Sequence, residues 1–145
     1  MAISTVLKVD SIAFAWGGNT RVLKCSKLRV WYDEDKQLFV AVDGASVVRI
    51  EGYFMRFSID LSFFVQDSGT ATSMREIINT INGGTAVNFY PIYSLDNSVN
   101  YAVIIPPMND VTILETDDWG RFTKRRKLVL HASARISSLP TWYTD

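Results

Sequence analysis

The sequence predicts a mainly β protein, an antiparallel β-sandwich or barrel with one short flanking α-helix at about residues 73–82. Apolar and polar residues alternate at period two in several segments, turn residues separate these segments, and one segment has helical periodicity. The 145 residues, 48% of them hydrophobic, are enough for one domain with a buried core. We therefore expect residues 1–145 to form a single β-rich structural domain with a short C-terminal tail at 137–145.

The first clear strand signal predicts a β-hairpin. Residues 27–32 alternate between apolar and polar, and the charged run at 33–36 is expected to turn the chain into a second strand at 37–42. Asp43 and Gly44 form the next turn signal. Residues 46–50 then lead to a further strand, with a kink or bulge expected at Gly52.

The longest alternating segment is Tyr53–Val65. Its apolar face consists of Tyr53, Met55, Phe57, Ile59, Leu61 and Phe63, and its polar face of Arg56, Ser58, Asp60 and Ser62. Such a strand would span about 40 Å, roughly twice the usual length, so we expect it to extend beyond a single small sheet. Arg56 and Asp60 are about 13 Å apart on an extended chain, so each needs another partner or water.

The helix prediction depends on three local signals. Ser73 and Glu76 fit a capping box, and Gly83 and Gly84 favour a helix end. An apolar stripe at helical spacing is expected to pack on the sheet, and it consists of Met74, Ile77, Ile78 and Ile81.

Later segments add further strands and the tail. The expected strands are 86–90, 99–105, 111–115 and 127–136. The tail at 137–145 is expected to dock through Trp142 and Tyr143.

Composition excludes several classes of partner. Fifteen basic and fifteen acidic residues cancel, which argues against a protein drawn to nucleic acid or to an anionic membrane by its overall charge. No apolar run is long enough for a membrane span, and the first residues lack a signal-peptide pattern. We expect a soluble, unprocessed protein that is synthesised in the host cytoplasm.

No catalytic or metal site is expected, and neither is a cofactor. His131 is the only histidine, and its place on the polar face of a strand favours a surface or interface residue over a general base. Cys25 is the only cysteine and is interpreted as a small buried hydrophobe. The acidic run at 33–35 favours a solvated hairpin over a calcium site. We therefore predict that the protein is not an enzyme, with a small hydrolase using His131 as a remaining possibility.

A charged stretch near the C-terminus suggests contacts between subunits. Acidic and basic residues follow each other closely there, so a solvated loop and electrostatic pairing with identical neighbours are both open. The candidate residues are Glu115, Asp117, Asp118, Arg121, Lys124, Arg125, Arg126 and Lys127.

The order of these elements resembles the tail-tube and distal-tail group of bacteriophage structural proteins. The resemblance covers about residues 47–136 and is carried by the long strand at 53–65, the capped helix, residues 84–90, the strand at 101–105 and the terminal strand at 126–136.

The resemblance implies a virion structural protein of the tail. It implies a homo-oligomeric ring, often of six subunits, in which long strands of neighbouring subunits join in a closed barrel around the DNA passage. Its partners would be further copies, other tail proteins and DNA as passing cargo only. The expected lumen face is Arg56, Ser58, Asp60 and Ser62.

Two other functions stay open. A carbohydrate-binding β-sandwich module would use exposed tryptophans such as Trp16 or Trp119 as sugar platforms. A head–tail connector or tail completion protein would share the virion location and the self-assembly.

Overall fold

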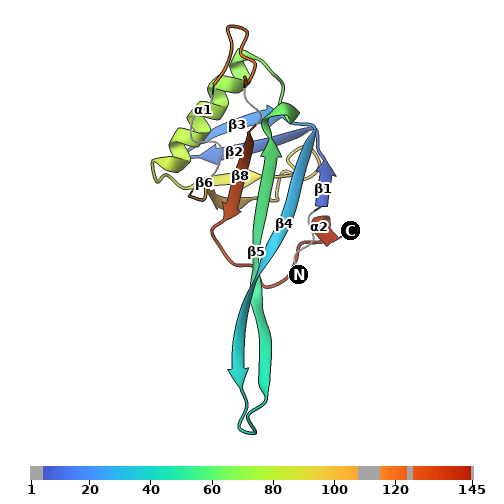
Figure 1. Cartoon of the computed structure of the whole chain (residues 1–145). Coiled ribbons are helices and arrows are strands. Elements are labelled where there is room, and N and C mark those ends of the chain that lie inside the picture. Colours follow the sequence, from blue (N-terminus) through green and yellow to red (C-terminus); the bar gives the residue numbers. More distant parts are fainter. Residues whose placement is uncertain (1–4, 108–114, 124–125, 145) are drawn as a thin grey trace.

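The computed structural model describes residues 5–107, 115–123 and 126–144, and it is mainly β as predicted. Eight strands form one antiparallel sheet in the order β1-β4-β5-β8-β7-β6-β2-β3 (Figure 1). The strands are β1 (Thr5–Lys8), β2 (Ser11–Trp16), β3 (Asn19–Lys24), β4 (Lys27–Val40), β5 (Ser46–Asp60), β6 (Val87–Tyr90), β7 (Tyr101–Ile104) and β8 (Lys127–Ala132). The helices are α1 (Ser68–Asn82), the short α2 (Thr141–Thr144) and the 3-10 turn η1 (Leu61–Phe63). The sheet is not closed into a barrel.

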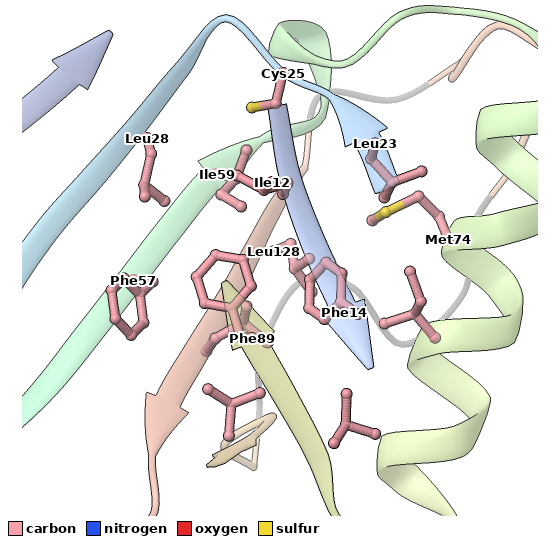
Figure 2. Close-up of a cluster of buried hydrophobic side chains, with 14 of the residues drawn as sticks. Ile12, Phe14, Leu23, Cys25, Leu28, Phe57, Ile59, Met74, Phe89 and Leu128 are labelled. Carbon is pink, nitrogen blue, oxygen red and sulfur yellow. The ribbon is translucent and has the colours of Figure 1, made fainter. Parts of the chain in front are cut away.

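The sheet bends back on itself, so β2 and β3 cross over the part formed by β4, β5 and β8 (Figure 1). Aromatic rings bridge the two parts of the sheet: Phe89 lies 4.9 Å from Phe14 and 5.0 Å from Phe57, measured between ring centroids. All three rings are fully buried. Figure 2 shows the side chains of β2, β5, β6 and β8 converging in this core.

Helix α1 starts five residues before the position predicted from the sequence. Its N-cap is Asp67, whose side chain accepts a hydrogen bond from the Thr70 N–H at 2.7 Å. Because this carboxylate already satisfies an exposed backbone donor, the helix begins there and the predicted capping residue Ser73 lies inside it. The helix end agrees with the prediction: Asn82 is the last helical residue, and Gly84 has a φ of +89°.

Helix α1 covers the core with its apolar stripe. Its buried side chains in the core cluster are Met74, Ile77, Ile78 and Ile81, and Figure 2 shows Met74 pointing toward Leu23 and Ile12. On its polar side, Glu76 accepts hydrogen bonds from the Arg21 guanidinium of β3 at 2.9 and 3.2 Å. The helix is therefore held to the sheet by apolar packing and by a two-pronged ion pair.

Strand β4 is longer than predicted because the charged run at 33–36 lies within it. Asp33 binds Arg56 of β5 at 2.7 Å, and Asp35 binds Arg135 at 2.8 Å. These partners keep acidic side chains within an extended strand, so the predicted turn is wrong. The chain turns instead at residues 41–45, where the Asp43 and Gly44 turn signal was recognised.

Strand β5 is long, but its ends differ from the predicted ends at 53 and 65. It stops at Asp60 because the Asp60 side chain accepts a hydrogen bond from the Ser62 N–H at 2.9 Å and caps the 3-10 turn. At the other end it includes residues 46–50, so the two predicted segments form one strand. Its extra length lies beyond the body of the sheet (Figure 1).

A β-bulge interrupts the β4–β5 pairing where the sequence predicted a kink. Asp35 pairs with Gly52 and Lys36 pairs with Ile50, so Glu51 is the extra residue. The bulge shifts β5 by one residue against β4. Val48 and Ile50 therefore lie on the same side as the even-numbered residues of β4.

The last strands are shorter than predicted. β6 and β7 fall within the segments 86–90 and 99–105, whereas residues 111–114 lie outside the described part. β8 ends at Ala132, four residues before the predicted end, because the chain bends at 133–134 before Ile136 forms an isolated bridge with Tyr53. In the tail, Trp142 and Tyr143 pack on the core cluster as predicted, with Trp142 donating a hydrogen bond to the Tyr101 hydroxyl at 3.3 Å.

Candidate functional site

The most prominent surface feature is a two-stranded extension of the sheet, residues 36–50, which we call the arm. It is formed by the far ends of β4 and β5 and projects from the body of the molecule (Figure 1). Seven large hydrophobic residues of the arm are exposed to solvent, and they are Leu38, Phe39, Val40, Val42, Val47, Val48 and Ile50. An isolated two-stranded ribbon is marginally stable in water, and contiguous exposed apolar surface marks an interaction site.

The two faces of the arm differ. Directly paired residues of an antiparallel ribbon share a face. One face carries Leu38, Val40, Val48 and Ile50, whose exposed fractions are 66%, 69%, 61% and 45%, with Lys36 and Ser46 at its two ends. The opposite face carries Phe39 and Val47 together with the polar pair Gln37 and Arg49. The first face is the more apolar, and the bulge at Glu51 is what places Val48 and Ile50 on it.

The tip of the arm is a well-defined turn. The Ala41 N–H donates to the Ala45 carbonyl at 2.8 Å, and the Gly44 N–H donates to the Ala41 carbonyl at 2.9 Å. Gly44 has a φ of +85°, a conformation that favours glycine. Asp43 accepts a hydrogen bond from the Ala45 N–H at 3.0 Å, so the turn is held by hydrogen bonds within the arm.

The base of the arm is clamped by the segment that follows β8. The Tyr53 N–H donates to the Ile136 carbonyl at 2.8 Å, and Arg135 binds Asp35 at 2.8 Å. This segment passes so close to Gly52 that an added Cβ would lie 2.5 Å from Arg135 Cγ and 2.7 Å from the Ile136 oxygen. Glycine at this position therefore allows the clamp to form.

A hollow of about 510 Å³ lies at the other end of β4 and β5. It is formed by the chain around Lys8 to Asp10, by residues 24–27 and by Phe63 to Val65. Three lysines and one aspartate line it, a net charge of +2, namely Lys8, Lys24, Lys27 and Asp10. A second hollow of about 440 Å³ shares Lys24 and Val65 and extends toward the start of α1.

Three of the four residues expected to form a lumen face, Arg56, Ser58 and Asp60, lie on the side of β5 opposite to the buried Met55, Phe57 and Ile59. Arg56 is engaged by Asp33 and donates to the Ala132 carbonyl at 3.3 Å, and Ser58 is only 8% exposed. Asp60 caps the 3-10 turn, and Ser62 lies within that turn rather than in the strand. Arg56 and Asp60 thus have the separate partners that their spacing required.

The charged stretch near the C-terminus is partly paired within the chain. Arg121 binds Asp117 at 2.8 Å, and Lys127 lies opposite Asp60 in the β5–β8 pairing. Gly120 packs against the backbone of Ser68, which places this loop at the start of α1. Glu115 and Arg126 also have partners, Asp118 is exposed, and Lys124 and Arg125 lie outside the described residues.

His131 and Cys25, the two reactive side chains considered from the sequence, have different surroundings. His131 is half-buried, and burial together with the neighbouring Arg56 lowers its pKa, while Asp33 acts in the opposite direction. Burial raises the pKa of Cys25 to about 11, and its thiol donates to the Lys27 carbonyl at 3.1 Å. Among the described residues there is no cluster of three or more potential metal ligands.

The tryptophans considered as sugar platforms have different surroundings. Trp16 carries the Arg21 guanidinium 5.5 Å from its ring centroid, where a sugar would have to stack. Trp119 is 77% exposed and lies in the loop that packs against α1. The geometry therefore offers no pair of open aromatic platforms formed by Trp16 and Trp119.

The arm is the feature that the sequence interpretation missed. The predicted hairpin segments contained its residues, but apolar and polar residues do not alternate there. Leu38, Phe39 and Val40 are consecutive apolar residues, and so are Val47 and Val48. Apolar residues on both faces of a ribbon indicate burial on both sides. No such cover exists within the described part of the chain.

Comparison of the chain with protein-family models, curated proteins and solved structures finds no match. Within the described residues, no helix is both long and apolar enough to cross a membrane.

Proposed function

We propose that this protein is a virion structural protein of a bacteriophage tail, a tail-tube or tube-like ring component that self-assembles around the DNA passage. The observation that carries the proposal is the arm, because seven exposed large hydrophobic residues on a projecting ribbon need a protein partner. The resemblance of the strand and helix order to tail proteins favours further copies of the chain as that partner. Other tail proteins would then contact the assembled ring.

The open edges of the sheet support an assembling subunit. Among the described residues, β1 and β3 are the edge strands of the sheet, and each pairs with a strand on one side only. Unpaired strand edges bind further strands unless something covers them. In a ring, neighbouring subunits cover these edges.

The polar outer face of β5 fits the side that faces the passage. Asp60 lines a hollow of about 310 Å³ with Arg29 and Lys127, and Ser58, only 8% exposed, lies at its wall. In the proposed ring this mixed-charge face lines a water-filled channel, and DNA passes it as cargo. Arg56 completes the face on β5 and is held in place by Asp33, whereas Ser62 follows in the 3-10 turn.

Negative-stain microscopy of the purified protein over a concentration series tests the proposal. We expect rings or short tubes that become more abundant as the concentration rises. A strict monomer at the highest concentration would contradict the proposal.

A further inference from the structure

The tip of the arm and the lysine-lined hollow lie at opposite ends of the same two strands. β4 begins at Lys27, which lines the hollow, and ends at Val40 in the arm. Its 14 residues span about 45 Å at roughly 3.3 Å per residue. The two sites therefore cannot meet within one chain, but they can meet between two copies.

The tip presents an apolar side chain next to a negative charge. Val42 is fully exposed at the turn, and the neighbouring Asp43 is the only charged residue between positions 37 and 48. The hydrogen bonds of the turn hold both residues in place before contact. A pre-formed tip loses little conformational entropy when it docks.

The hollow offers the complementary chemistry. Its three lysines outnumber its single aspartate, so the lining is positive where the tip is negative. Its apolar part includes Phe63, on whose ring Lys27 lies at 5.8 Å, and Val65, which is 44% exposed. The start of α1 lines the adjoining hollow. Trp119, another exposed apolar residue, lies in the loop that packs against this part of the helix.

We propose that the arm tip of one copy docks into the lysine-lined hollow of the next copy, so that copies join head to tail. The inference rests on the proposed self-assembly and adds the identity of the contact and its direction. A contact between two different surfaces of one molecule is heterologous. Such a contact repeats from copy to copy in one direction. It gives a ring when the rotation between neighbouring copies closes on itself.

Charge reversal on each side of the contact tests the inference. One variant is Asp43→Lys, and the other combines Lys24→Glu with Lys27→Glu. Sedimentation velocity over a concentration series measures association, and circular dichroism checks that each variant is folded. The control for charge reversal is Arg75→Glu, an exposed position on α1 outside the arm and outside both hollows.

Each variant alone places like charges in the contact. We therefore expect the protein concentration at which half of the molecules associate, the association midpoint, to rise about ten-fold or more. An equimolar mixture restores association, because each arm then meets a hollow of opposite charge. The Arg75→Glu control associates over the same concentration range as the unmodified protein. Asp43→Asn, which removes the charge and keeps a side-chain acceptor for the turn, gives a smaller effect than Asp43→Lys.

Two outcomes would overturn the inference. If the Lys24→Glu and Lys27→Glu variant associates like the unmodified protein, the hollow is not the docking site, and arm-to-arm pairing becomes the better description. If the mixture fails to recover association while both variants are folded, the two surfaces do not meet. In both cases rings seen by microscopy would leave the proposed function standing, whereas a strict monomer at every concentration would remove function and inference together.

Discussion

Gly52 shows how a single residue positions the arm. The chain after β8 crosses the base of the arm at a distance that leaves no space for a Cβ. Sequence alone predicted a kink or bulge at Gly52, and the bulge is there. The reason for glycine was not predictable, because the residues that crowd it are Arg135 and Ile136, more than 80 positions away in the chain.

Replacing Gly52 with alanine is expected to destabilise the fold. The added methyl group displaces Arg135 and Ile136, at a cost of about 1–3 kcal/mol in the free energy of unfolding. Urea denaturation measures this change. Gly69→Ala is the matched control: its nearest neighbour is an Asp67 oxygen at an ordinary 3.4 Å, so we expect little or no loss. Equal stability of the two variants would contradict the crowding at Gly52.

Cys25 is expected to be nearly inert in the folded protein. With its pKa raised to about 11 by burial, the thiolate becomes abundant only as the pH rises through that value. At pH 8 the two-unit rise above the unperturbed pKa of 9.0 makes the thiolate about 100-fold rarer than in the unfolded chain. A colorimetric thiol reagent measures the rate with and without denaturant, since the chain has one cysteine. Similar rates in both conditions would show that Cys25 is accessible.

At the level of secondary structure, the elements with a clear periodic pattern were predictable. Met55, Phe57 and Ile59 alternate on β5 and are all buried, and the stripe of α1 is buried as well. β2 was not assigned from the sequence, because Ile12, Ala13 and Phe14 are consecutive and all buried, so period two is absent. Strands covered on both faces lose the alternating pattern.

Element ends were harder to predict because distant partners decide them. The acidic run stays in β4 because Arg56 and Arg135 lie 23 and 100 positions away from the aspartates they bind. Asp67 starts α1, although the sequence also contains the capping-box pattern at Ser73. Asp67 and Ser73 are both possible helix caps by local sequence, and in the structure Asp67 is the residue that caps α1.

The two candidate caps of α1 can be compared directly. Asp67→Ala removes the acceptor for the Thr70 N–H, so we expect the melting temperature to fall by about 3 °C or more. Ser73→Ala lies inside the helix and is expected to change the melting temperature little. Thermal unfolding followed by circular dichroism measures both. A larger effect at Ser73 would show that the helix begins where the sequence pattern placed it.

The same hydrogen bond predicts a pH dependence. Donation from Thr70 lowers the pKa of Asp67 below its ordinary value of 3.8 in the folded state. The cap therefore stabilises the fold at pH values above the unfolded pKa, and this contribution is lost as the pH falls through the lower folded pKa. We expect the difference in melting temperature between the unmodified protein and Asp67→Ala to be constant near neutrality and to shrink below about pH 4. A difference that persists at pH 2 would contradict this origin.

At the level of the whole molecule, the exposed apolar residues are concentrated on the arm. The body buries the core cluster between the folded sheet and α1, whereas the arm keeps seven large hydrophobic side chains in solvent. The sequence predicted part of the body of the molecule, but it did not predict that the exposed apolar residues gather on the arm. In the proposed assembly a second molecule covers the arm, and one chain's sequence does not show where that molecule binds.

The central claim is that the apolar face of the arm drives self-assembly. Leu38→Lys combined with Val48→Glu tests it, because these residues pair directly and the introduced opposite charges keep the hairpin paired and the net charge unchanged. The matched control, Gln37→Glu combined with Arg49→Lys, places a similar pair on the opposite face. Sedimentation velocity over a concentration series is the decisive measurement. We predict that the first variant stays monomeric where the unmodified protein and the control associate, and equal association of all three would contradict the account.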